Sequence, residues 1–228
     1  MKSVVLFDLD GTVLTYEGGA PGPGRTALDA AMRDLYALEG ATLGLRVAGG
    51  TDRGLARSLL SRAGIEGDEE AIDRVLASYL AHLAKVVERR CYRPVGDVAG
   101  AVSALTTCGA IVGIATGNVR EGARIKLGSA GLGSTFDFAL GGFGCDAEPR
   151  ADILRAALRR CAAEGIASVV VVGDTEHDVR AGRAVGARVV GVATDDESRA
   201  ELEAAGADAI VGTCGEELVA RVTSMMAI

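Results

Sequence analysis

Two aspartates stand two residues apart near the start of the chain, in the segment Asp8-Leu9-Asp10-Gly11-Thr12. On an extended chain, side chains at i and i+2 point the same way, so both carboxylates face one site. Like charges this close repel each other, and a divalent cation is their natural partner. An aspartate carboxylate can also attack phosphorus to form an aspartyl-phosphate. The pair therefore indicates a divalent-cation site or a carboxylate that accepts a phosphoryl group, with an Asx turn at a strand end as the structural alternative.

Three apolar runs end in polar segments, and each run is typical of a short buried strand. Residues 4–7 lead into the two aspartates, and Gly11 marks the turn that follows them. Residues 110–115 and 168–172 lead into the segments Thr116-Gly117-Asn118 and Gly173-Asp174-Thr175-Glu176-His177-Asp178. Ligands of parallel sheets bind beyond the carboxyl ends of the strands, so we expect the three polar segments to meet at one site.

The elements that must position these residues alternate along most of the chain. Strands are predicted at 4–7, 110–115, 136–140, 168–172, 187–192 and 209–211, and helices at 120–130, 151–163, 177–185, 197–205 and 216–222. Alternation of this kind implies right-handed crossovers and a parallel sheet that is covered on both faces. The expected fold class is α/β, a doubly wound parallel sheet.

Residues 16–90 interrupt this alternation, because they contain only helical patterns. A glycine- and proline-rich approach is followed by predicted helices at 25–38, 53–63 and 69–89. We therefore expect residues 1–15 and 91–228 to form the α/β core domain, and residues 16–90 to form an inserted helical domain.

The bulk composition is that of a soluble globular protein. The chain has 228 residues, of which 49% are hydrophobic and 24% charged, and its net charge is −7. The basic residues form no stripe, which disfavours nucleic acid as a partner. No apolar run reaches transmembrane length, and residues 1–8 form a strand rather than an export signal. We expect a cytoplasmic protein with no membrane partner, and either a monomer or a homodimer fits.

Taken together, the motifs resemble those of the haloacid dehalogenase-like superfamily of phosphotransferases. The resemblance runs from Lys2 to about Val211 and rests on residues 8–12, 116–118 and 173–178, with an imperfect match at Arg150. It implies a Mg²⁺-dependent phosphohydrolase that acts on a small phosphorylated metabolite. It also implies that the inserted helices are a cap over the active site. A helical subdomain with no moving role is the structural alternative.

The resemblance implies a role for each carboxylate of the motifs. Asp8 would be the nucleophile, and Asp10 would protonate the leaving oxygen and later deprotonate the hydrolytic water. The expected metal set is Asp8, the main-chain carbonyl of Asp10, Asp174 and, as a supporting residue, Asp178. Capping of a helix is the alternative for Asp174 and Asp178.

Phosphate and substrate contacts are expected from two further segments. The Thr116 hydroxyl and the backbone of Gly117 and Asn118 would hold phosphate oxygens at a strand-to-helix junction. In the inserted domain, the loop from Arg46 to Arg53 resembles the Gly-x-Thr-Asp loop of phosphoglycolate phosphatase-like proteins. The resemblance implies substrate contacts by Thr51 and Arg53 in this loop.

One position departs from the superfamily's pattern. The third motif usually supplies a lysine that pairs with the nucleophile and the phosphate, and residues 146–152 contain none. Glu148-Pro149 in place of the common Lys-Pro pair would bring a negative charge there. We therefore assign this role to Arg150, whose planar guanidinium can clamp phosphate oxygens in a bidentate manner. A solvated residue in the first turn of a helix is the alternative.

The same motifs leave other activities to weigh. A haloacid dehalogenase is disfavoured, because it works without a metal and does not need Asp10. A phosphonatase is disfavoured, because no lysine near Arg53 is placed to form a Schiff base. A hexose-phosphate mutase keeps both aspartates and the cap, and it stays an alternative. A non-catalytic regulator that binds phosphate or metal is favoured only by the missing lysine.

Overall fold

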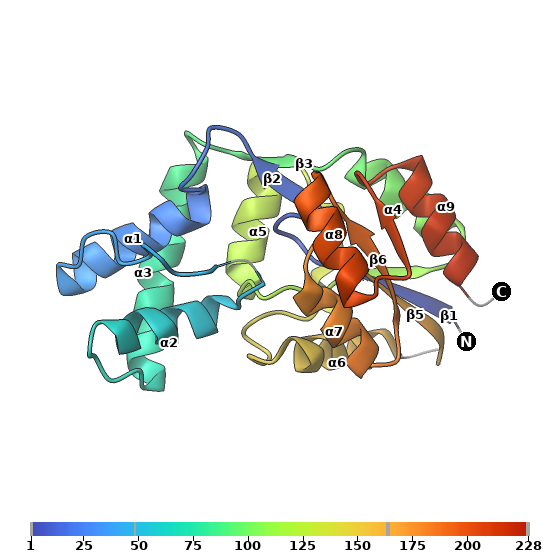
Figure 1. Ribbon diagram of the computed structural model, residues 1–228. Coiled ribbons are helices and arrows are strands. Elements are labelled where there is room, and N and C mark those ends of the chain that lie inside the picture. The colour runs from blue at the N-terminus through green and yellow to red at the C-terminus, as the bar shows by residue number, and fades with distance from the viewer. Residues whose placement is uncertain (1, 48, 163–164, 227–228) are drawn as a thin grey trace.

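The computed structural model describes residues 2–47, 49–162 and 165–226. Within these residues, the centre of the molecule is a five-stranded parallel sheet with the strand order β4-β1-β5-β6-β7 (Figure 1). The strands are β1 (Lys2–Phe7), β4 (Ile111–Ile114), β5 (Ile166–Gly173), β6 (Arg188–Val192) and β7 (Ala209–Val211). The fold class is therefore the predicted one, a parallel α/β sheet flanked by helices.

The register of the central strand brings the polar motifs to one edge of the sheet. Phe7 at the end of β1 pairs with Ile114 of β4 on one side and with Val172 of β5 on the other. The three strands run in parallel, so the residues that follow them emerge at the same edge. This alignment places Asp8 between the segments that begin at Thr116 and at Asp174.

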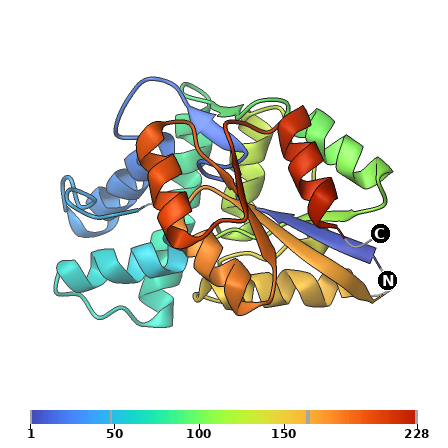
Figure 2. The same ribbon diagram turned by 45° about the vertical axis from the view of Figure 1, so that its right-hand side comes forward.

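Alternate side chains of β1 build two separate cores, one on each face of the sheet. Val5 and Phe7 belong to the core that also includes residues of α4 (Val98–Thr107) and α9 (Glu216–Met225). Val4 and Leu6 belong to the core that includes residues of α6 (Arg150–Cys161), α7 (Glu176–Ala184) and α8 (Asp196–Ala205). Figure 2 shows α6 and α7 on the opposite side of the sheet from α4 and α9. Such burial on both faces is typical of parallel strands.

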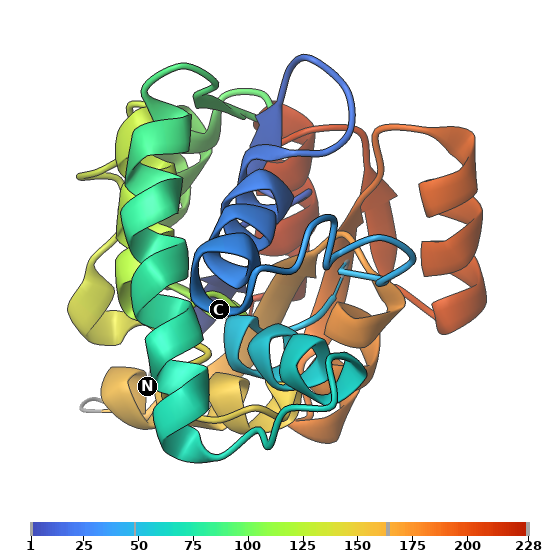
Figure 3. The same ribbon diagram turned by 90° about the vertical axis from the view of Figure 1, so that its left-hand side faces the viewer.

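Three helices form a separate group beyond the carboxyl ends of the strands (Figures 1 and 3). They are α1 (Pro23–Tyr36), α2 (Asp52–Arg62) and α3 (Glu69–Val87). The side chains of Thr51 and Asp68 cap α2 and α3 by accepting hydrogen bonds from backbone N–H groups. Helix α5 (Arg120–Ser129) lies between this group and the sheet and packs against α3 (Figure 1). Among the described residues, we find no helix with the length and apolarity needed to cross a membrane.

The structure adds elements that the sequence pattern does not indicate, and it corrects one prediction. The short strands β2 (Leu14–Tyr16) and β3 (Tyr92–Pro94) pair in antiparallel fashion where the chain enters and leaves the helical group. Helix α4 was not predicted either. The strand predicted at 136–140 is wrong: Phe138–Leu140 form a 3₁₀ turn, because the Asp137 side chain accepts a hydrogen bond from the Ala139 N–H. The last residue of the helix predicted at 151–163, Ala163, lies outside the described residues.

Candidate active site

Three carboxylates meet where β1 and β5 end. Asp8, Asp174 and Asp178 each offer an oxygen, and these atoms lie within 4.8 Å of one another. Asp8 follows β1, and its N–H donates to the carbonyl of Val172 at 2.9 Å. Asp174 accepts a hydrogen bond from the Thr12 hydroxyl at 3.1 Å. The structure thus brings together three of the acidic residues predicted for the metal site.

Gly11 allows the turn after β1 to approach Asp174. Its φ of 85° lies in the left-handed region, which favours glycine. A Cβ atom at this position would overlap the Asp174 carboxylate. The turn after β1 therefore requires glycine both for its backbone conformation and for the space beside Asp174.

Arg150 lies beside the predicted nucleophile. It begins α6, and only 13% of its side chain is exposed. Its Nη2 atom is 2.9 Å from Asp8 Oδ1 and 2.6 Å from Asp178 Oδ1, and Nε donates to the same Asp178 oxygen at 3.1 Å. The other oxygen of Asp178 accepts hydrogen bonds from the Thr175 N–H and hydroxyl. Arg150 thus occupies a buried position between two carboxylates, and not a solvated one.

The carboxylates of this cluster carry more negative charge than Arg150 neutralises. Burial, with added repulsion from Asp178 and Asp8, raises the pKa of Asp174 well above its usual value. Burial likewise raises the pKa of Asp8, although the charge of Arg150 pulls in the opposite direction. A divalent cation would relieve this repulsion, and oxygen ligands are those that Mg²⁺ prefers. The residues present therefore fit a magnesium ion.

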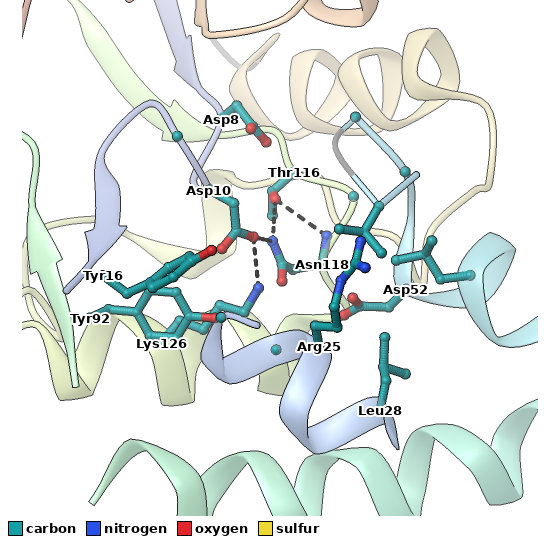
Figure 4. A pocket seen from close by; sticks show the side chains of 18 of the residues that line it. Asp8, Asp10, Tyr16, Arg25, Leu28, Asp52, Tyr92, Thr116, Asn118 and Lys126 are labelled. Atoms are coloured by element: carbon teal, nitrogen blue, oxygen red, sulfur yellow. Dashed lines mark hydrogen bonds and ion pairs between the residues drawn. The ribbon is translucent and has the colours of Figure 1, made fainter. Parts of the chain in front are cut away.

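Asp10 has a different set of partners from Asp8. Its Oδ2 atom accepts two hydrogen bonds of 2.7 Å each, one from Asn118 Nδ2 and one from Lys126 Nζ (Figure 4). Burial opposes the charge on Asp10, but Lys126 and Asn118 hold the pKa of this carboxyl below its usual value. About half of the side chain, 45%, is nevertheless exposed, and Asp10 lines the cavity described below.

The segment after β4 lies under the loop that precedes α2. The Thr116 hydroxyl accepts a hydrogen bond from Asn118 Nδ2 at 2.8 Å. The carbonyl of Gly117 accepts one from the Asp52 N–H at 2.9 Å, and a Cβ atom on Gly117 would overlap the backbone of Gly50. A larger residue at 117 would thus separate the helical group from the sheet.

Most of these groups, though not Asp178, line one cavity of about 480 Å³ between the sheet and the helical group. Asp8, Asp10, Thr116, Arg150 and Asp174 line one end of it. The other end is lined by aromatic and apolar side chains together with a few charged ones, namely Tyr16, Leu28, Val47, Leu55, Tyr79, Tyr92, Arg25, Asp52 and Lys126. The cavity therefore has a charged end, where the motifs meet, and a mixed end built largely by the helical group.

Sequence reasoning assigned no role in the site to three charged residues that line the mixed end. Lys126 of α5 is one, and its place in the helix offered a signal, because it shares a buried face with Ala123 and Leu127. Arg25 of α1 is another, and it donates to two backbone carbonyls of the segment 42–45. Asp52 is the third; burial raises its pKa to about 6, and it accepts a hydrogen bond from the Val119 N–H.

The two residues predicted to contact substrate from the helical group have other roles in the structure. The Thr51 hydroxyl accepts a hydrogen bond from the Gly54 N–H and caps α2. Arg53 does not line the cavity, because its guanidinium pairs with Glu69 and, at 2.8 Å, with Asp73 of α3. Ala48 of the same loop lies outside the described residues. The assignment of Arg53 to substrate binding therefore finds no support in this geometry.

The chain is similar to known hydrolases over most of its length. The profile of a hydrolase family, the haloacid dehalogenase-like hydrolases, matches residues 2–186. The probable phosphatase IndB of Dickeya dadantii is 30% identical over 222 residues, which cover 95% of this chain and 92% of that protein.

Solved structures share the fold at lower sequence identity. The structure of CbbY from Rhodobacter sphaeroides in complex with phosphate superimposes with a TM-score of 0.69 at 19% identity, covering 95% of this chain and 96% of that one. A putative beta-phosphoglucomutase from Bacteroides vulgatus gives a TM-score of 0.69 at 17% identity, with 98% and 88% covered.

Proposed function

The chain belongs to the haloacid dehalogenase-like hydrolase family, and on that premise we propose that it is a Mg²⁺-dependent phosphohydrolase of small phosphate monoesters. The observation that carries the proposal is the environment of Asp8. This aspartate follows β1 in a buried position, pairs with Arg150 at 2.9 Å and adjoins Asp174 at the charged end of the cavity. A nucleophile, a cation for the phosphoryl oxygens and a metal ligand thus lie together.

We assign the reaction steps to residues that line the cavity. A carboxylate oxygen of Asp8 attacks phosphorus, while the guanidinium of Arg150 and the Thr116–Asn118 segment bind the other phosphoryl oxygens. The bond between phosphorus and the ester oxygen breaks, and the leaving alcohol takes a proton from Asp10. Asp10 must therefore be protonated when the ester binds, although Lys126 and Asn118 favour its charged form. Water then attacks the aspartyl-phosphate and gives a proton back to Asp10. Inorganic phosphate leaves, and Asp8 is restored.

The magnesium ion would be held by Asp8, Asp174 and the main-chain carbonyl of Asp10. When bound, it neutralises charge on the phosphoryl oxygens and on Asp8. Both oxygens of Asp178 already accept hydrogen bonds, from Arg150 and from Thr175. We therefore place Asp178 in support of the site, where it orients Arg150, rather than among the direct ligands.

We further propose that residues 16–90 act as a cap domain over a core made of residues 1–15 and 91–228. Helices α1 and α3 and the loop before α2 supply much of the cavity's mixed end. The paired strands β2 and β3 are the connection between the two parts. A cap in this position shields the aspartyl-phosphate from bulk water and selects the leaving alcohol.

The mixed end of the cavity favours a neutral, hydroxyl-bearing leaving group over a carboxylate. Each cation that lines this end already has a partner: Lys126 pairs with Asp10, and Arg25 donates to backbone carbonyls. Asp52 adds negative charge there, and the tyrosines can donate hydrogen bonds to hydroxyl oxygens. A cavity of about 480 Å³ also exceeds the needs of a two-carbon acid. Sugar phosphates therefore suit this site better than phosphoglycolate.

The geometry also bears on the alternatives. The missing lysine was the feature that favoured a non-catalytic regulator, and Arg150 supplies a positive charge beside Asp8 in its place. A hexose-phosphate mutase would use the same first step but pass the phosphoryl group to a second sugar hydroxyl. The two activities differ in whether inorganic phosphate accumulates.

We expect the protein to release inorganic phosphate from neutral sugar phosphates with Mg²⁺ present, and to lose this activity in EDTA. Excess Mg²⁺ should restore it, because the carboxylate pair needs a cation. The value of kcat/KM for sugar phosphates should exceed that for phosphoglycolate by about tenfold or more. The carboxylate of phosphoglycolate would be an unpaired charge in the mixed end, at a cost of about 1.4 kcal/mol or more. A phosphate-release assay over a panel of esters measures both effects. Activity that is unchanged in EDTA would refute the metal assignment.

A further inference from the structure

Lys126 carries a buried charge and lines the mixed end of the cavity. None of the reaction steps assigned above uses it. Its side chain is 6% exposed and lies on α5. The ammonium is 2.7 Å from Asp10 Oδ2 and 5.4 Å from the centre of the Tyr92 ring. Taking a lysine out of water is costly unless its charge is paired, and a buried ion pair seldom stabilises a fold more than apolar packing does. A gain in stability is therefore a poor explanation for a lysine here.

Two side-chain donors converge on a single oxygen atom of Asp10. Lys126 Nζ and Asn118 Nδ2 both donate to Oδ2, each at 2.7 Å. One donor comes from a helix and the other from the segment after β4, so together they fix the plane of the carboxylate. The side chain of Asp10 keeps 45% of its surface exposed, Asp10 lines the cavity, and both of these hydrogen bonds use Oδ2 rather than Oδ1.

The surroundings of Lys126 show that its place is tightly defined. A Cβ atom on Gly24 of α1 would lie 3.8 Å from the lysine nitrogen, 3.8 Å from the Tyr79 hydroxyl and 3.4 Å from the Tyr92 hydroxyl. Residues of the helical group and of the core thus enclose the ammonium together. The nucleophile has its own cation, Arg150, so the two aspartates of the first motif are served by two different basic residues.

We propose that Lys126 is a positioning residue for Asp10, which it holds with Oδ1 directed toward the ester oxygen of the substrate. This inference rests on the proposed phosphohydrolase function. Proton transfer to an alkyl leaving group requires a correctly placed acid, whereas an aryl leaving group departs without one. Hydrolysis of the aspartyl-phosphate again requires Asp10, whichever ester formed it.

The experiment compares two esters in the variant Lys126→Met, which keeps the length of the side chain and removes its charge. For a hexose phosphate, kcat/KM should fall by about 10²-fold, the typical effect of a misplaced catalytic group. For p-nitrophenyl phosphate, kcat/KM should fall by less than about threefold, because the first step needs no acid. The kcat for p-nitrophenyl phosphate should nevertheless fall, because hydrolysis of the aspartyl-phosphate still requires Asp10. A burst of nitrophenol should then precede the slow steady state.

Three controls separate positioning from a general loss of structure. Lys85→Met changes an exposed lysine of α3 and should leave both esters unaffected. In the background Asp10→Asn, the change Lys126→Met should cost nothing further, because the residue it positions is gone. Methylammonium should partly restore the hexose phosphate activity of Lys126→Ala, which leaves space for the lost ammonium.

The outcomes discriminate clearly. Selective loss on the alkyl ester, a burst on the aryl ester and no added effect in the Asp10→Asn background support the inference. Equal losses on both esters, or full additivity with Asp10→Asn, would overturn it in favour of a structural role. An unchanged Lys126→Met variant would overturn it as well. If the wild-type protein hydrolyses neither ester with Mg²⁺, the proposed function fails first, and the inference fails with it.

Discussion

Replacement of Asp8 by asparagine should abolish turnover of every phosphate ester and leave the fold intact. An amide oxygen cannot form the aspartyl-phosphate, and loss of a nucleophile lowers kcat by at least about 10⁴-fold. The folded protein should be no less stable than the wild type, because repulsion and burial already raise the pKa of Asp8 in the carboxylate cluster. Phosphate release and thermal unfolding, measured on the same preparation, test both expectations.

Asp152→Asn is the matched control for this change. Asp152 lies in the first turn of α6, is about half exposed and pairs with Arg155, away from the cavity. Its loss should leave kcat and stability nearly unchanged, since exposed ion pairs contribute little. Residual activity of Asp8→Asn above about one part in 10³ would remove Asp8 from the role of nucleophile, because water attack would then explain the turnover.

Replacement of Arg150 by alanine should damage both activity and stability. The guanidinium is the cation between Asp8 and Asp178, and its removal leaves two buried carboxylates facing each other. Breaking a buried pair in this way typically costs about 3–5 kcal/mol of the free energy of unfolding. We expect kcat/KM to fall by about 10²–10³-fold, as when one donor to a transition-state anion is lost. Phosphate-release kinetics and urea unfolding measure the two effects.

Two variants sharpen this test. Arg150→Lys restores the charge without the planar fork, so it should recover most of the stability but only part of kcat/KM. Arg155→Ala, an exposed change on the same helix, should alter neither quantity. A kinetic profile of Arg150→Ala that matches the wild type would show that the arginine binds no phosphate and that another residue neutralises the phosphoryl oxygens.

The two aspartates of the segment 8–12 pair with two different basic residues. Asp8 pairs with Arg150, and Asp10 pairs with Lys126. The proposed nucleophile thus adjoins a cation suited to phosphate oxygens, whereas Lys126 donates to Oδ2 of the proposed acid–base residue. In the proposed mechanism, Arg150 therefore takes the place of the lysine that the segment 146–152 lacks.

The sheet and the acidic cluster could be predicted because their signals are local. A buried parallel strand is a continuous apolar run in the sequence. The residue after it lies at the carboxyl edge of the sheet, where ligands bind, and this does not depend on distant parts of the chain. Asp8 and Asp174 were found on that basis. Arg150 was found from the resemblance together with its charge, since the segment of the third motif lacks the usual lysine and Arg150 is the cation within it.

The remaining features depend on tertiary contacts that the sequence pattern does not record. Lys126 is one lysine on an amphipathic helix, and only its packing shows that it is buried against Asp10. Arg53 was expected at the substrate, but the acidic face of α3 holds it elsewhere. Strands β2 and β3 have three residues each, too few to show a period. The phenylalanines at 136 and 138 favour a strand, yet the Asp137 cap makes a turn.

The measurement that bears most directly on the proposed function is the detection of the phosphoryl group on Asp8. The variant Asp10→Asn should accumulate the aspartyl-phosphate, because it lacks the base for hydrolysis. The variant is mixed with p-nitrophenyl phosphate and Mg²⁺, and the reaction is quenched rapidly. Peptide mapping by mass spectrometry should then find the phosphoryl group on the peptide that contains Asp8. The double variant Asp8→Asn/Asp10→Asn should carry none. Phosphate release without any modified peptide, or a phosphoryl group on another residue, would contradict the proposed mechanism.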